Sequence, residues 1–116
     1  MDTDEGKTMF IAIVQIPGII RTRDEAIASG LASVEKFRNL DGLISKHYLN
    51  GDTGGGGVYI FESREKAEAW FNDDWWPMME AAFGVRPTLS LYDNYVVVDN
   101  EAGEVRVEGK AHKPAA

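Results

Sequence analysis

The apolar run near the start of the 116-residue chain limits its fold more than any other feature. Residues 8–16, TMFIAIVQI, are almost all apolar and rich in β-branched side chains, and Pro17-Gly18 ends the run with a turn signal. Because side chains alternate along a strand, one face would hold Met9, Ile11 and Ile13, and the other Phe10, Ala12, Val14 and Ile16. A strand that is apolar on both faces must be covered on both, which predicts a central strand in a layered fold.

Two segments with helical spacing separate the predicted strands. The first begins at Thr22, where Glu25 completes a capping-box pattern, and its apolar stripe consists of Ala26, Ile27, Leu31, Val34 and Phe37. Gly30 lies inside this helix at a cost of about 1 kcal/mol, which is tolerable where another element approaches closely. The second begins after Ser63, restarts near Pro77 and ends at Gly84.

The remaining apolar segments predict three more strands and a terminal hairpin. LISKHYLN (residues 43–50) alternates, VYIF (58–61) follows a glycine run, and a long strand from Thr88 to Asp99 turns at Gly103 into VRVE. The order strand, helix, strand, strand, helix, strand predicts an α+β, ferredoxin-like βαββαβ fold. In this fold both helices lie on one face of an antiparallel four-stranded sheet. We expect one domain over residues 8–108, a disordered segment at 1–7 and a flexible tail at 109–116.

The glycines of GDTGGGGVYIF (residues 51–61) do not predict a phosphate site. Such a site needs glycines that open into a helix N-terminus, with Lys or Ser/Thr placed to meet the phosphates. Here the glycines open into a strand, and no GK[ST] follows. We therefore expect them to join two antiparallel strands and to supply positive φ or a bulge.

Charge and composition exclude several classes of partner. A net charge of −7 argues against nucleic acid and anionic membrane surfaces, because both require a basic patch. The absence of cysteine removes disulfides and thiolate chemistry, and with one histidine outside the tail a multi-histidine metal site is not expected. The polar N-terminus has no signal-peptide pattern, so a cytoplasmic location is predicted.

The doubly apolar first strand also predicts a homodimer, since helices cover only one face of the sheet and a second copy would cover the other. This arrangement is the dimeric α+β barrel. The run GGVYIFESREKAEAWF, then FGV and LYDNYVV, resembles the YdhR-type mono-oxygenase family of that superfamily, which is related to antibiotic-biosynthesis mono-oxygenases. The resemblance covers about residues 9–98. It implies a cofactor-independent mono-oxygenase that oxidises a small aromatic, phenolic or quinol-like substrate.

Two groups of side chains are candidates for the site. Proton transfer is assigned to His47, Tyr59 or Tyr92, and orientation of an oxygen atom to Asn94. A ligand-binding lining is assigned to Phe61, Trp70, Trp75, Trp76 and Met79. Both sets have a structural alternative: the tryptophans can seal a helix or a dimer interface, and a lone strand histidine is more often structural. Tyr59, Phe61, Tyr92 and Asn94 are expected on one face, against either the helices or a partner sheet.

Two other functions remain open from the sequence. A non-catalytic dimeric module that binds a small apolar metabolite would use the same aromatic lining and would not need His47. An isomerase or lyase acting on a lactone or diketide is compatible with the same fold. The superfamily's haem-degrading constellation of Asn, Trp and His is incomplete here, because the first strand lacks Asn and the second helix lacks His.

Overall fold

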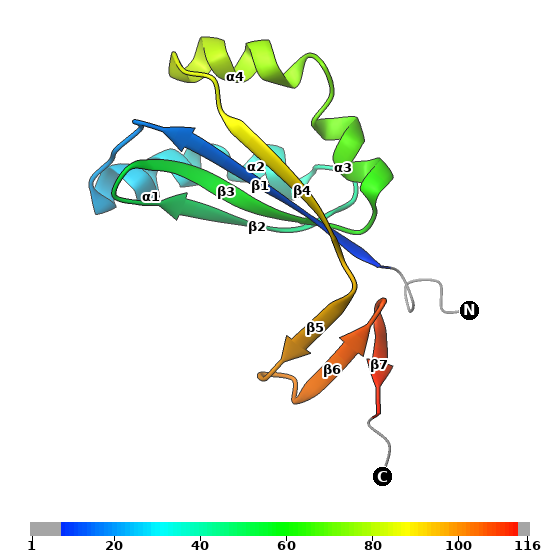
Figure 1. Ribbon diagram of the computed structural model, residues 1–116. Helices are drawn as coiled ribbons and strands as arrows, with labels where there is room; N and C mark the ends of the chain where they lie inside the picture. The colour runs from blue at the N-terminus through cyan, green and yellow to red at the C-terminus, as the bar shows by residue number, and fades with distance from the viewer. Residues whose placement is uncertain (1–7, 114–116) are drawn as a thin grey trace.

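The structure, a computed structural model, describes residues 8–113 and confirms the predicted ferredoxin-like fold (Figure 1). Its elements are β1 (Met9–Pro17), α1 (Arg23–Ala32), α2 (Val34–Arg38), β2 (Leu43–Asn50), β3 (Gly54–Phe61), α3 (Arg64–Trp70), α4 (Trp75–Phe83), β4 (Thr88–Asn94), β5 (Val96–Asp99), β6 (Glu104–Val107) and β7 (Lys110–His112). The first four strands form an antiparallel sheet in the order β2-β3-β1-β4. The other three form a second sheet beyond one end of the first.

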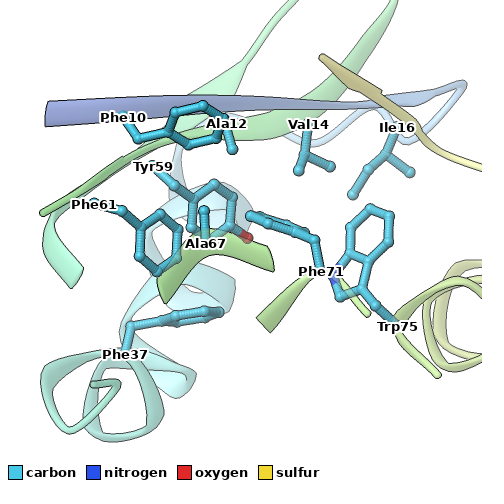
Figure 2. Close-up of a cluster of buried hydrophobic side chains, with 10 residues drawn as sticks. All are labelled: Phe10, Ala12, Val14, Ile16, Phe37, Tyr59, Phe61, Ala67, Phe71 and Trp75. Atoms are coloured by element: carbon cyan, nitrogen blue, oxygen red, sulfur yellow. The ribbon is translucent and has the colours of Figure 1, made fainter. Parts of the chain in front are cut away.

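The hydrophobic core lies on one face of the main sheet, here called the inner face. The strands contribute Phe10, Ala12, Val14, Ile16, Tyr59 and Phe61 to this core, and the helical segments contribute Phe37, Ala67, Phe71 and Trp75 (Figure 2). Phe71 packs edge to face against both Tyr59 and Trp75 with 5.1 Å between ring centroids, whereas Tyr59 and Phe61 lie nearly parallel, 6.3 Å apart. The opposite, outer face carries Met9, Ile11 and Ile13 of β1, which are only half-buried. The helices therefore cover one face of the doubly apolar strand and leave the other open.

The residues that the sequence predicts to begin the first helix form the expected capping hydrogen bonds. Thr22 N–H donates to Glu25 Oε1 at 2.8 Å, and Glu25 N–H donates to Thr22 Oγ1 at 3.2 Å, which completes the capping box. The single helix expected here divides at Ser33 into α1 and α2. A Cβ on Gly30 would lie 3.5 Å from the Tyr48 ring, an ordinary contact distance, so the packing of α1 on β2 does not require a glycine here.

The second helical region also follows its sequence signals. Ser63 accepts a hydrogen bond from Lys66 N–H at 3.2 Å and caps α3. The expected restart gives α4, with Pro77 in its first turn, and Gly84 ends it at φ +74°. These signals depend on neighbouring residues only, so they could be found in the sequence.

Three features differ from the predicted strands. The last strand breaks at Tyr95: Asn94 pairs with Met9, the first residue of β1, and within residues 8–113 the main sheet offers no partner beyond this pair. Within the expected tail, Lys110–His112 pair with β6. A bulge between Leu43 and Ser45 places Leu43 opposite inner-face Phe61. The predictions for residues 1–7 and 114–116 concern segments outside the described residues.

Candidate functional site

A cavity of about 450 Å³ lies between the helices and the inner face, at the glycine-containing end of β3. Gly55 and Gly57 face the helices, because they pair with the inner-face residues Ile16 and Val14 of β1. Side chains of the cavity wall approach both glycines: a Cβ on Gly57 would lie 3.2 Å from Lys46 Cε and 3.3 Å from Tyr59 Cε1, and one on Gly55 would lie 3.7 Å from an Arg21 guanidinium nitrogen. The two glycines therefore make room for the side chains that line the cavity.

The other two glycines allow the strands to approach closely. A Cβ on Gly54 would collide with the Ile16 carbonyl oxygen, and one on Gly56, at φ +153°, with that of Val14. All four glycines belong to β3, and the preceding turn consists of residues 51–53. Their role is thus in the sheet, and they do not precede a helix N-terminus.

Lys46 extends from β2 into the cavity wall because it pairs with inner-face Tyr59. Its Nζ lies 3.6 Å from the ring centroid of Phe37, 4.2 Å from that of Tyr48 and 4.8 Å from that of Tyr59. Within residues 8–113 the Nζ atom forms no hydrogen bond and no ion pair. Burial, followed by the charge of Lys36, lowers the pKa of Lys46 to about 7. The three rings attract an ammonium and oppose this effect. Lys46 can therefore gain or lose a proton near neutral pH.

Two more cations line the same cavity. Lys36 Nζ lies 5.1 Å from the centroid of Phe37 and 5.7 Å from that of Trp70, and Arg21 Cζ lies 5.9 Å from that of Phe83. Among the described residues, the lining contains no Asp or Glu. The chain as a whole has 19 acidic and 12 basic residues, so the cavity's charge is opposite to that of the molecule.

Hydroxyl groups add polar contacts to the aromatic walls. Burial, then the neighbouring Tyr48, raises the pKa of Tyr59, which keeps this phenol protonated and able to donate a hydrogen bond. The Tyr48 hydroxyl is 2.8 Å from Ser33 Oγ, a contact that ties β2 to the end of α1. Trp70 Nε1 is buried without a hydrogen-bond partner in the described part of the chain.

The structure brings some predicted site residues together at the cavity: Tyr59, Trp70, Trp75 and Met79. Phe61 also faces the helices but belongs to the packed core. Trp76 lies outside the lining, where its ring centroid is 4.9 Å from that of Trp75 and 4.4 Å from Arg86 Cζ. The two adjacent tryptophans thus point in different directions, as expected for a helix.

The other three predicted residues lie on the outer face, away from the cavity. His47 pairs with Val58, and its Nε2 is 3.4 Å from Ser45 Oγ. Tyr92 is opposite Ile11, and Asn94 donates to the Val96 carbonyl oxygen at 3.2 Å. Tyr59 and Phe61 therefore do not share a face with Tyr92 and Asn94, contrary to the expectation from alternation. The registers on the two sides of β1 place these pairs on opposite faces.

Sequence reasoning missed the three cations of the cavity. The alternation of residues 43–50 places Lys46 and Tyr48 on one face, and this was the available signal. It does not tell which face meets the helices. That depends on the pairing of Lys46 with Tyr59. Lys36 and Arg21 reach the cavity because α2 and the loop before α1 pack beside it. No sequence pattern in either segment predicts this packing.

Neither a metal cluster nor a membrane-spanning helix is found in the described residues. No group of three or more His, Cys, Asp or Glu side chains within residues 8–113 is arranged to hold a metal ion. None of the helices in this range has the length and apolar character needed to cross a bilayer.

Comparison with known proteins identifies the fold. No protein-family model and no curated protein matches the sequence. Among solved structures, the chain is similar to a monooxygenase from the gene ActVA-Orf6 of Streptomyces coelicolor in complex with nanaomycin D. The TM-score is 0.60 at 16% identity, over 84% of this chain and 97% of that one. It is also similar to the NE2512 protein of unknown function from Nitrosomonas europaea, with a TM-score of 0.56 at 16% identity, over 80% and 95% of the chains. The chain therefore shares the fold of this monooxygenase.

Proposed function

We propose that this protein is a cofactor-independent mono-oxygenase that acts on a small aromatic, phenolic or quinol-like substrate. The observation that carries the proposal is the aromatic cavity of about 450 Å³, in a chain with the fold of a monooxygenase that was crystallised with nanaomycin D. We also propose the YdhR-type branch for this chain, on the run GGVYIFESREKAEAWF.

The proposed reaction uses the cavity to expel water and to orient the substrate beside molecular oxygen. A quinol supplies four electrons, so that one oxygen atom enters its ring and the other leaves as water, and the product is a hydroxyquinone. The protonated Tyr59 hydroxyl donates a hydrogen bond to a substrate oxygen. Of the four residues predicted to handle protons or oxygen, Tyr59 alone lines the cavity within one described chain. The proposal therefore gives His47, Tyr92 and Asn94 no direct role.

Oxygen uptake with a panel of benzo- and naphthohydroquinones tests this function. We expect enzyme-dependent uptake, unchanged by chelators or added flavin, and one atom of ¹⁸O₂ in the product by mass spectrometry. Ala26→Trp should abolish turnover because Ala26 lines the cavity, whereas Ala28→Trp on the same helix, outside the lining, should retain it. No turnover across the panel, or equal loss in both variants, would contradict the proposal.

A non-catalytic binding module is the second candidate. It is favoured by the position of His47, which lies on the face of the sheet opposite the cavity. Trp70 and Trp75 line the cavity, so their fluorescence reports on occupancy. Saturable quenching by a hydroquinone without formation of any product would support the binding module over the enzyme.

We propose in addition that two copies pair through the outer face. Met9, Ile11 and Ile13, together with Val58 and Ile60 of β3, form an apolar surface that is half-exposed in the single chain. Sedimentation equilibrium should give about twice 12.8 kDa. Deletion of residues 99–116 should weaken the assembly if the second sheet reaches the partner. A monomer at micromolar concentration would contradict the pairing.

A further inference from the structure

We propose that the cavity binds an acidic phenol or enol as its oxyanion, and that Lys46 accepts the hydroxyl proton. This inference rests on the proposed function, because it specifies the substrate class for the same cavity. It adds a catalytic residue that the sequence analysis did not identify.

The first support is the sign of the charge around the cavity. Arg21, Lys36 and Lys46 line it, and the described part of the lining has no carboxylate. None of the three cations forms an ion pair within residues 8–113. In a chain of net charge −7, three basic side chains without a carboxylate partner among residues 8–113, gathered around one apolar space, favour an anionic ligand over a neutral or cationic one.

The second support is the surroundings of the Lys46 amine. Phe37, Tyr48 and Tyr59 present ring faces to it, and these contacts hold the side chain without supplying a hydrogen-bond acceptor. Gly57 leaves room for the chain, since a Cβ there would lie 3.2 Å from Lys46 Cε. A buried ammonium without an acceptor is costly, and a ligand oxyanion in the cavity would supply the missing partner.

The proposed step is a single proton transfer. The ligand O–H bond breaks and its electron pair stays on oxygen, while a new N–H bond forms at Nζ, so that an ammonium–oxyanion pair results and no oxidant is needed. The titratable groups that face Lys46 are Lys36 of α2, Tyr48 on the same strand and Tyr59 of β3. The charge of Lys36 favours the neutral amine in the empty cavity, which makes Lys46 a proton acceptor near neutral pH. The bound oxyanion is then held between the two lysines.

Anaerobic titration with 4-nitrophenol tests the inference without any oxidation, because its phenolate absorbs at a longer wavelength than the phenol. Near neutral pH, we expect wild type to bind it with growth of the phenolate band. Lys46→Met should weaken binding by about tenfold or more and remove the band growth. The neutral analogue 4-nitroanisole should bind both proteins with affinities within about twofold, since it has no proton to give.

Two further variants make the result specific. Lys110→Met removes the same charge from exposed strand β7 and should behave as wild type. Lys46→Arg keeps a cation that cannot accept a proton, so it should still bind phenolate but release the phenol proton to the medium, whereas wild type keeps this proton on Nζ. Proton release measured with a pH indicator in weak buffer separates the two, and equal release by both proteins would contradict proton transfer to Lys46. Melting curves will establish that each variant is folded.

The inference is overturned if Lys46→Met shows the wild-type band, if wild type binds both probes equally, or if it binds 4-nitrophenol not at all. Phenolate binding without oxygen uptake would refute the mono-oxygenase and leave this inference standing. Turnover of quinols with 4-nitrophenol bound as the neutral phenol would refute this inference alone.

Discussion

The inner face of the main sheet has two ends that differ in packing although the same strands build both. At the packed end, Phe10 of β1 pairs with Phe61 of β3, and both are at most 1% exposed. At the hollow end, Val14 pairs with Gly57, and side chains of Lys46 and Tyr59 at the cavity wall use the room that this glycine leaves. The sequence GGGGVYIF of β3 therefore changes within one strand from an end beside the cavity to an end that packs in the core.

The two ends also differ in how their basic side chains are paired. At the packed end, Arg64 Cζ lies 4.7 Å from the Phe10 ring, and its guanidinium pairs with Glu68 at 3.2 Å and Asp93 at 3.7 Å. At the hollow end, Lys46 contacts three rings and pairs with no carboxylate of residues 8–113. A cation over an aromatic ring is thus paired with carboxylates at one end and has no carboxylate partner among the described residues at the other.

The largest expected effect comes from opening a void at the packed end. Phe61→Ala should lower the free energy of unfolding by about 3–5 kcal/mol, because a fully buried ring is lost and the packed rings cannot collapse fully into the space. Urea denaturation measures this loss. Ile20→Ala, at a side chain that is 64% exposed, should change stability by less than about 0.5 kcal/mol. Similar losses in both variants would remove the distinction between packed and exposed apolar positions.

A smaller, pH-dependent effect is expected from Lys46→Met at the hollow end. The pKa of Lys46 is about 7 in the folded chain and 10.5 ordinarily, so the unfolded state binds more protons between these values. The wild-type penalty is therefore full below about pH 7 and fades as pH rises toward about 10.5. Facing groups Lys36, Tyr48 and Tyr59 remain in the variant. Lys46→Met should therefore be more stable than wild type at low pH, because it removes a buried charge. We expect a gain on the order of 1 kcal/mol only, since partial exposure and the ring contacts reduce the penalty of the buried ammonium.

Thermal melts of both proteins near pH 6 and pH 10 measure this difference. The gain from Lys46→Met should shrink at the higher pH, whereas the exposed Lys110→Met should show little gain at either. An equal gain in stability at both pH values would mean that the gain does not come from removing the charge of Lys46.

The smallest expected effect is at Gly30, in the helix over the hollow end. Gly30→Ala should raise stability by up to about 1 kcal/mol, because alanine favours the helix and its Cβ would meet the Tyr48 ring at an ordinary contact distance of 3.5 Å. Gly103→Ala is the matched contrast: its φ of +70° disfavours any Cβ, and stability should fall by about 1 kcal/mol. Chemical denaturation distinguishes the two signs. A loss at Gly30 would mean that this wall of the cavity has no room for a methyl group.

The same contrast explains what the sequence could predict. Caps at Thr22 and Ser63, the stop at Gly84 and the alternation of β1 depend on neighbouring residues, and they gave the order of elements and the inner side chains of β1. The break at Tyr95 depends on where a distant strand begins, and the bulge near Leu43 on the pairing with β3. The cavity depends on how α1, α2 and α4 pack against β1, β2 and β3. Such relations between segments have no local pattern.

Helix α1 contributes side chains to the wall of the cavity but none to the buried core. It has no fully buried residue, yet Ala26, Ile27 and Leu31 line the cavity, with Ile27 46% and Leu31 68% exposed. Substitutions at these positions reshape the binding space at little cost in folding stability, because they remove few buried contacts. In the proposed enzyme, selection and directed evolution would therefore be free to alter substrate preference here before any compensating mutation is required elsewhere. For that function, the helix would be a readily evolvable specificity element on a scaffold stabilised by other residues.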